Sequence, residues 1–177
     1  THQGVICTNG SELVYLRDTD GDDRADVRKS IFRGFNMGDT HAGVSNLRHG
    51  PDNWIYATVG YSGFNGRVGN EDHQFSTGLF RFKIDKSLAG AEPGEDGTMQ
   101  HLVKLEFVQN TTNNTWGLGF TRNLNTFTST ANGNPSLYLT FPKSSYERAG
   151  LEQPRMPRAD SKPLFFPAST DIRQVEN

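Results

Sequence analysis

Short runs in which hydrophobic and polar residues alternate recur along the chain up to about residue 143, where helical spacing of apolar residues is hard to find. Because successive side chains of a strand point to opposite faces of a sheet, this period of two predicts β-strands. Turn residues separate the runs, as in Gly50-Pro51-Asp52-Asn53. The pattern predicts strands near residues 4–8, 13–17, 28–35, 43–49, 54–60, 78–84, 102–109, 115–120, 126–130 and 136–141.

A weak internal repeat relates residues 47–60 (LRHGPDNWIYATVG) to residues 118–131 (LGFTRNLNTFTSTA), at an offset of about 71. Each copy has an apolar strand, a polar turn and a strand that alternates aromatic with small residues. The offset is longer than a typical blade repeat of ~40–45 residues. We expect an insertion at 68–76 and a glycine-rich surface loop at 85–99 to account for the excess. Four strands between equivalent points correspond to one blade of a β-propeller.

The sequence therefore predicts an all-β fold: a partial β-propeller of about two to three four-stranded blades of a larger ring, with an irregular C-terminal tail. Residues 1–36 would form the outer strands of a blade, 37–110 a full blade, 111–145 part of the next blade and 146–177 the tail. Because such an arc cannot close a ring alone, we expect the rest of the propeller on a larger protein or a partner chain. An independent β-sandwich is the alternative.

Composition agrees with many short strands joined by tight turns, because Gly (19) and Phe (12) are abundant while hydrophobic residues make up only 33%. The net charge of −2 offers no general attraction to nucleic acid or to anionic lipid. No apolar stretch approaches the length of a membrane span. Cys7 is the only cysteine, which excludes an internal disulfide and the C-x-x-C-H motif of a c-type haem within this chain.

Aspartates recur at regular spacing between the second and third predicted strands. Counted from Asp18, carboxylates occupy loop positions 1, 3, 5 and 9, and position 7 offers a backbone carbonyl; these residues are Asp18, Asp20, Asp22, Asp26 and Arg24. Ca²⁺ prefers six to eight oxygen ligands, and such alternation wraps oxygens around one point. Lys29 stands where an EF-hand has its bidentate Glu, so the pattern predicts a structural calcium loop in a β-hairpin. A solvated acidic turn without metal is the alternative.

A histidine, His41, precedes the predicted strand 43–49. In a propeller, the beginnings of inner strands surround the mouth of the central channel, where ligands bind. A histidine there suits a general base near neutral pH. A turn or core histidine is the alternative.

His41, the Gly50-Pro51-Asp52 turn and the strand end Thr58-Val59-Gly60 resemble soluble quinoprotein glucose/sorbosone dehydrogenases. The stretches 15–26, 38–64, 113–135 and 171–175 are closer still to putative membrane-bound dehydrogenases of planctomycete-type bacteria. Those proteins fuse such a propeller to helical repeats and a C-terminal c-type haem domain. The resemblance implies that His41 removes a proton from a sugar hydroxyl while a hydride passes to pyrroloquinoline quinone.

Two positions depart from the quinoprotein pattern. Tyr61 stands where the acid that orients the base is expected, and Asn113-Asn114 replaces the expected Arg-Asn pair. Loss of that Arg removes a fixed positive charge for the quinone. These departures argue against binding of pyrroloquinoline quinone. The resemblance therefore supports the fold more strongly than it supports the reaction.

The remaining candidates surround this region in the sequence. Asp39 could orient His41 through its carboxylate, and capping a loop is the alternative. Arg48 could bind a ligand anion, and a salt bridge is the alternative. Amides beside aromatic rings suit sugar recognition, although Asn residues are equally common in turns. This polar and aromatic set comprises Tyr61, Asn113, Asn114, Trp116, Asn132 and Asn134.

Taken together, these features predict the propeller portion of a periplasmic or extracellular dehydrogenase-like protein that oxidises a sugar or polyol. His41 would accept the proton, with Arg48 and Asn114 as positioning groups. Electrons would leave to a quinone or to a c-type haem domain outside this chain. A non-catalytic, calcium-stabilised propeller that binds glycans or proteins as a scaffold is the alternative, and the departures at Tyr61 and Asn113 favour it.

Overall fold

A computed structural model describes residues 3–131 and 135–159, and it confirms an all-β chain. The first strands are β1 (Val5–Asn9), β2 (Glu12–Arg17), β3 (Val27–Arg33), β4 (Val44–His49) and β5 (Ile55–Val59). They are followed by β6 (Phe64–Val68), β7 (Glu71–Phe75), β8 (Gly78–Ile84) and β9 (Val103–Asn110). The last are β10 (Thr115–Phe120), β11 (Thr126–Thr130) and β12 (Leu137–Tyr138). Short helical segments are η1 (Thr40–Ala42), η2 (Gln100–Leu102) and α1 (Lys143–Arg148).

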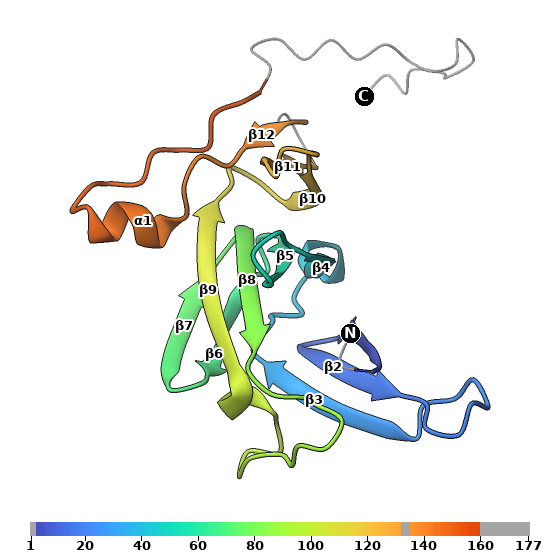
Figure 1. Cartoon of the computed structure of the whole chain (residues 1–177). Coiled ribbons are helices and arrows are strands. Elements are labelled where there is room, and N and C mark those ends of the chain that lie inside the picture. Colours follow the sequence, from blue (N-terminus) through green and yellow to red (C-terminus); the bar gives the residue numbers. More distant parts are fainter. Residues whose placement is uncertain (1–2, 132–134, 160–177) are drawn as a thin grey trace, which may run out of the picture.

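The strands form small antiparallel sheets that follow one another along the chain (Figure 1). We call β1-β2-β3 the first sheet, β4-β5-β8-β9 the central sheet and β10-β11-β12 the last sheet. Every strand pair is antiparallel, and within the described residues the sheets do not close into a barrel. The two similar sequence stretches lie in different sheets, at β4–β5 and β10–β11. This is the arrangement of a partial β-propeller.

The central sheet is buried on both faces, as β5 illustrates. Alternate residues Ile55, Ala57 and Val59 join the core shared with the first sheet, where Leu13, Tyr15 and Phe32 are fully buried. Tyr56, between them, joins a second core with Leu118 and Leu137 of the last sheet. Burial on both faces explains why β5 reads as an almost continuous apolar run.

The hairpin β6–β7 was not predicted, because residues 68–76 were expected to be an insertion without strands. Its residues pair from Phe64↔Phe75 to Val68↔Glu71. The Phe64 ring lies 4.9 Å from the ring of Phe35 and stacks on Phe75 at 5.1 Å. Polar residues interrupt the alternation, so the hairpin depends on packing against aromatic residues distant in the sequence.

The loop predicted at 85–99 has irregular backbone, but it is not wholly on the surface. Leu88 and Met99 are fully buried. The ammonium group of Lys29 on β3 donates to the carbonyls of Leu88 (3.0 Å), Ala89 (3.3 Å) and Ala91 (2.6 Å). The loop is therefore attached to the first sheet by a cation that bonds three backbone carbonyls.

The C-terminal part is irregular as far as the structure describes it. Apart from α1, residues 139–159 contain one isolated β-bridge, between Leu137 and Arg158. Asp171–Val175, which contributed to the family resemblance, lies outside the described residues. In the described ranges, no helix is long and apolar enough to cross a membrane.

Candidate functional site

One end of the central sheet brings together residues that are far apart in the sequence. The register aligns Val44 with Val59, Val59 with Gly78, and Gly78 with Asn110. Because neighbouring strands are antiparallel, β4 and β8 begin at this end while β5 and β9 finish there. The adjoining segments carry most of the residues predicted for catalysis and substrate binding: Asp39, His41, Tyr61, Asn113 and Asn114.

Asp39 is the centre of a hydrogen-bonded cluster with His41 and Tyr61. Its Oδ1 accepts the backbone N–H of His41 at 2.9 Å, which caps η1, and lies 3.4 Å from Nδ1 of the same residue. Its Oδ2 accepts the hydroxyl of Tyr61, and its backbone carbonyl accepts Ser62 Oγ at 2.7 Å. The acid beside His41 therefore precedes it by two residues, and Tyr61 supports that acid.

The electrostatics of this cluster follow from these bonds. The Tyr61 hydroxyl, followed by the His41 backbone N–H, holds the pKa of Asp39 below its ordinary value of 3.8. The same bond to Asp39 raises the pKa of Tyr61 above 10.0. The imidazole of His41 is 82% exposed, and within the described residues its Nε2 makes no hydrogen bond.

Asn114 connects the beginning of β10 to this cluster. Its side chain is 8% exposed, and its Oδ1 is buried without a hydrogen-bond partner in the described part of the chain. A β-carbon added to Gly60 would lie 1.7 Å from this oxygen and 2.7 Å from the carbonyl oxygen of Ala42. The amide therefore lies against the α-carbon of Gly60, whose C–H groups are weak donors, beside the segment that bears His41.

Asn113 is held within a group of threonine hydroxyls. Its carbonyl accepts the hydroxyls of Thr77 and Thr111, and its Oδ1 accepts the backbone N–H of Asn114 at 2.6 Å. Thr77, Thr111 and Thr115 lie within 2.7–3.0 Å of one another through their hydroxyl oxygens. These interactions orient the Asn113-Asn114 turn. Sequence reasoning missed the three threonines, because nothing in their spacing shows that they meet.

Trp116 lies on β10 and is linked to the central sheet through Asn46. The Asn46 amide donates to the Trp116 carbonyl at 2.5 Å and to Thr58 Oγ1 at 3.1 Å. The register is irregular at both ends of this link, between Ser45 and Arg48 and between Thr115 and Gly117. Trp116 is 51% exposed, so part of the indole is open to a ligand.

Other predicted residues are not part of the cluster. Arg48 lies near the end of β4, paired with Tyr56, and within the described residues it makes no ion pair or hydrogen bond. It is four residues beyond Val44, so it stands roughly 13 Å along the strand from the end that carries His41. Asn132 and Asn134 lie outside the described residues.

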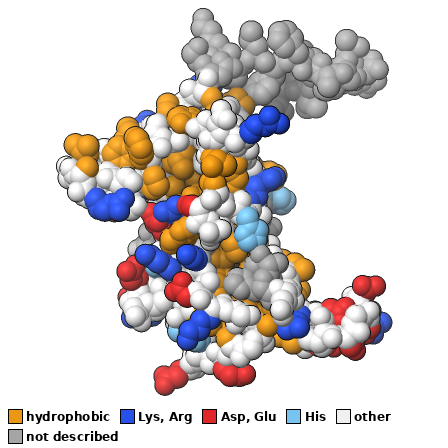
Figure 2. All heavy atoms as spheres, in the orientation of Figure 1, with side chains coloured by type: hydrophobic (Ala, Val, Ile, Leu, Met, Phe, Trp, Pro, Cys, Tyr) orange, Lys and Arg blue, Asp and Glu red, His pale blue; other side chains and the backbone are white. Residues whose placement is uncertain are grey.

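The predicted calcium loop projects from the far end of the β2–β3 hairpin, where acidic side chains gather (Figures 1 and 2). Carboxylate oxygens of Asp18, Asp20 and Asp22 lie within 4.8 Å of one another. Oxygens that all bind one Ca²⁺ at about 2.4 Å are at most about 4.8 Å apart. These three side chains therefore meet a necessary condition for sharing an ion.

Hydrogen bonds inside the loop set the directions of its carboxylates. Asp18 accepts backbone N–H groups of Gly21 (2.7 Å), Asp23 (3.0 Å) and Asp20 (3.1 Å), which lower its pKa. Asp26 accepts both the hydroxyl and the N–H of Thr19 at 2.7 Å, which lower its pKa. Asp26 thus closes the loop and is not among the three clustered carboxylates. The Arg24 N–H donates to Asp22 at 2.9 Å.

Comparison with known proteins identifies one family. No protein of curated function matches this chain, and no solved structure matches it. A family model described as a domain of unknown function, DUF7133, matches residues 1–177. The chain therefore belongs to the DUF7133 family.

Proposed function

We propose that this chain is the propeller portion of an extracytoplasmic, dehydrogenase-like protein that oxidises a sugar or polyol, with His41 as the proton acceptor. The observation that carries the proposal is the Asp39–His41 pair, in which a carboxylate oxygen lies 3.4 Å from Nδ1. A carboxylate at Nδ1 favours the tautomer whose proton is on Nδ1, so that Nε2 is free to accept one.

The chemistry assigned to the cluster is the removal of a hydroxyl proton. The substrate hydroxyl gives its proton to Nε2 of His41, and the resulting imidazolium is stabilised by Asp39. The hydrogen on the carbon that bears this hydroxyl leaves with its electron pair, as a hydride, to a two-electron acceptor such as a quinone outside this chain. The reduced acceptor then passes its two electrons, one at a time, to a c-type haem domain. The half-exposed rings of Tyr61 and Trp116 supply flat faces for stacking a sugar ring.

Residues around His41 do not fit pyrroloquinoline quinone. That cofactor carries three carboxylates and needs fixed positive charge. Among the described residues, His41 is paired with the carboxylate of Asp39, which Tyr61 bonds in turn, and the Asn114 amide lies against the neighbouring Gly60. The Asn113 amide oxygen is occupied by the Asn114 N–H, so the expected Arg has no replacement there. We derive no step through this cofactor.

The same proposal assigns a structural Ca²⁺ to Asp18, Asp20 and Asp22. Their oxygens are close enough to share one ion, and three like charges this close repel one another strongly without a cation. Asp26 supports the loop through Thr19. A calcium loop of this kind suits a calcium-rich compartment, so the proposal includes a periplasmic or extracellular location.

A second candidate function, a scaffold that binds glycans without turnover, is favoured by the exposure of the site. The His41 ring is 82% exposed, and a desolvated pocket that would strengthen base catalysis is not formed by the described residues around it. In this candidate, Tyr61 and Trp116 bind sugar rings and His41 is a surface hydrogen-bonding group.

The two candidates are separated by turnover in the full-length protein. A panel of sugars and polyols is tested for reduction of a soluble dye acceptor, with His41→Ala and, as a matched control, His101→Ala. The dehydrogenase proposal expects His41→Ala to lower the rate by about 10²–10⁴-fold while His101→Ala is unaffected. Absence of reduction with every compound contradicts it. Glycan binding that survives His41→Ala and weakens in Trp116→Ala then supports the scaffold.

A further inference from the structure

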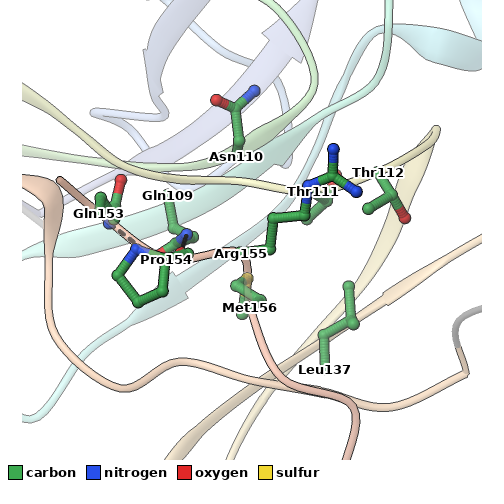
Figure 3. Close-up of a pocket in the computed structure, with 9 residues that line it drawn as sticks. All are labelled: Gln109, Asn110, Thr111, Thr112, Leu137, Gln153, Pro154, Arg155 and Met156. Carbon is green, nitrogen blue, oxygen red and sulfur yellow. Dashed lines mark hydrogen bonds between the residues drawn. The ribbon is translucent and has the colours of Figure 1, made fainter.

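A cavity of about 420 Å³ is lined by residues other than those of the Asp39–His41–Tyr61 cluster. It is enclosed by the end of β9, by β12 and by the C-terminal segment 153–156 (Figure 3). Its lining includes Asn110, Thr111, Thr112, Leu137, Arg155 and Met156. A volume of this order holds a ligand the size of one monosaccharide.

The walls of the cavity are held in place by buried hydrogen bonds. Gln109 is 3% exposed, and its Nε2 donates to the Pro154 carbonyl at 2.9 Å. Gln153 donates in turn to Gln109 Oε1 at 2.6 Å and to the Val108 carbonyl at 3.1 Å. The segment that bears Arg155 is thus attached to β9 before any ligand arrives, so little ordering is needed on binding.

One charged side chain borders the cavity, and it is also exposed to solvent. Arg155 is the only charged residue of the lining, and within the described residues it makes no ion pair or hydrogen bond. In Figure 3 its side chain extends from the segment 153–156 toward Thr111 and Thr112, which line the same cavity. Leu137 and Met156, both buried, form an apolar surface at the other side.

We propose that this cavity binds a small carboxylate-bearing polyol, the chemistry of a sugar acid. The guanidinium of Arg155 matches a carboxylate with two parallel hydrogen bonds. The Asn110 side chain, whose Nδ2 donates to the Thr77 carbonyl at 3.2 Å, offers its amide oxygen to hydroxyls, and Leu137 and Met156 contact the C–H face of the ring. A single guanidinium balances one carboxylate, whereas a phosphate monoester carries about two charges near neutral pH.

The test is calorimetric titration of the full-length protein with D-glucuronate, D-glucose and D-glucose 6-phosphate. We expect D-glucuronate to bind and D-glucose to bind at least tenfold more weakly. Arg155→Gln should weaken D-glucuronate binding at least tenfold, and Arg155→Lys should be intermediate, because the charge persists while the paired geometry is lost. Arg122→Gln, which removes an exposed charge that pairs with nothing in the described part of the chain, should have no effect.

Three results would overturn the inference: no D-glucuronate binding by the wild type, equal binding by Arg155→Gln, or tighter binding of the phosphate ester. His41→Ala should leave this binding unchanged. Failure of the proposed oxidation at His41 is therefore distinguishable from failure of this site. Thermal unfolding of Arg155→Gln checks that any loss of binding is not a loss of folded protein.

Discussion

The hydroxyl of Tyr61 donates a hydrogen bond to Oδ2 of Asp39, while the other oxygen of that carboxylate faces the backbone and ring of His41. Tyr61 stands where the family resemblance led us to expect an acid. The structure supplies an acid to His41 from the other direction along the chain, and the tyrosine takes part in the same cluster. Although Tyr61 is not an acid, it bonds Asp39, and Asp39 provides the carboxylate beside His41.

Replacing Tyr61 by Phe should raise the pKa of Asp39 towards 3.8, because the tyrosine hydroxyl is the largest cause of its lowering. The bond adds stability above pH 3.8 that disappears as the pH falls through the lowered pKa of Asp39. The stability that this bond adds is also lost at high pH, as the pH rises through the raised pKa of Tyr61 and the hydroxyl loses its proton. Carboxyl ¹³C NMR titration measures the change. Tyr138→Phe, which loses only an exposed bond to Asn125, is the control, and an unchanged Asp39 pKa in Tyr61→Phe would contradict this assignment.

Replacing Gly60 by Ala should destabilise the fold and displace Asn114. The new methyl group would lie 1.7 Å from Asn114 Oδ1 and 2.7 Å from the Ala42 carbonyl. Overpacking of this kind costs about 1–3 kcal/mol of unfolding free energy, measured by urea denaturation. Gly119→Ala in β10 is a matched control, because its methyl group would meet nothing within 4 Å. Equal stability of the two variants would show that Asn114 does not lie against Gly60 in solution.

Adding Ca²⁺ should raise the unfolding temperature, since an ion that binds only the folded chain stabilises it. At a hundred times the dissociation constant the gain is about 2.7 kcal/mol, or on the order of 5–10 °C for a chain of this size. Asp20→Asn should abolish most of this shift. Asp23→Asn should preserve it, because Asp23 is not among the three clustered carboxylates. A wild-type unfolding temperature that is the same in Ca²⁺ and in chelator would refute the calcium site.

Replacing Glu12 by Gln should reduce stability at neutral pH. Burial raises the pKa of Glu12, but hydrogen bonds from Ser30, Arg28 and Arg33 outweigh it and lower the pKa from 4.5 to about 2. Glu12 lies 2.6 Å from the Arg28 guanidinium, which is half exposed. Solvent screening therefore limits the expected loss to about 1–2 kcal/mol.

The sign of the pH dependence follows from the lowered pKa of Glu12. Its contribution is fully present above pH 4.5 and is lost as the pH falls through about 2. Urea unfolding at pH 7 and pH 2 should therefore show a gap between wild type and Glu12→Gln that closes at the lower pH. Glu92→Gln, at an exposed position without a hydrogen bond or ion pair within the described residues, should match the wild type throughout.

Strand positions followed closely from the alternation of the sequence, because burial of a sheet face imposes a period of two on the chain. The predicted strand at 78–84 and those at 115–120 and 126–130 have the observed bounds. The hairpin β6–β7 was missed because only Phe64, Val68 and Phe75 face the core, and polar residues fill the positions between them. Its stability comes from aromatic neighbours such as Phe35, which no local pattern reveals.

The candidate site shows the same division. Asp39 and His41 are two residues apart, so their contact could be predicted from the sequence as a helix cap in a short turn. The contact of Asn114 with Gly60 joins residues more than fifty positions apart, and it exists only because β5 ends where β9 leads into β10. Arg48, predicted beside His41, lies near the other end of β4.

The sequence by itself determined that this chain is built of strands, where its turns lie and that acidic side chains alternate between β2 and β3, because each follows from residues a few positions apart. Tertiary structure alone decided that Tyr61 meets Asp39, that the hydroxyls of Thr77 and Thr111 both bond the Asn113 carbonyl and that Arg155 lines a cavity beside β9. Such contacts depend on the register and stacking of separate sheets, and these are set by the burial of many distant side chains together.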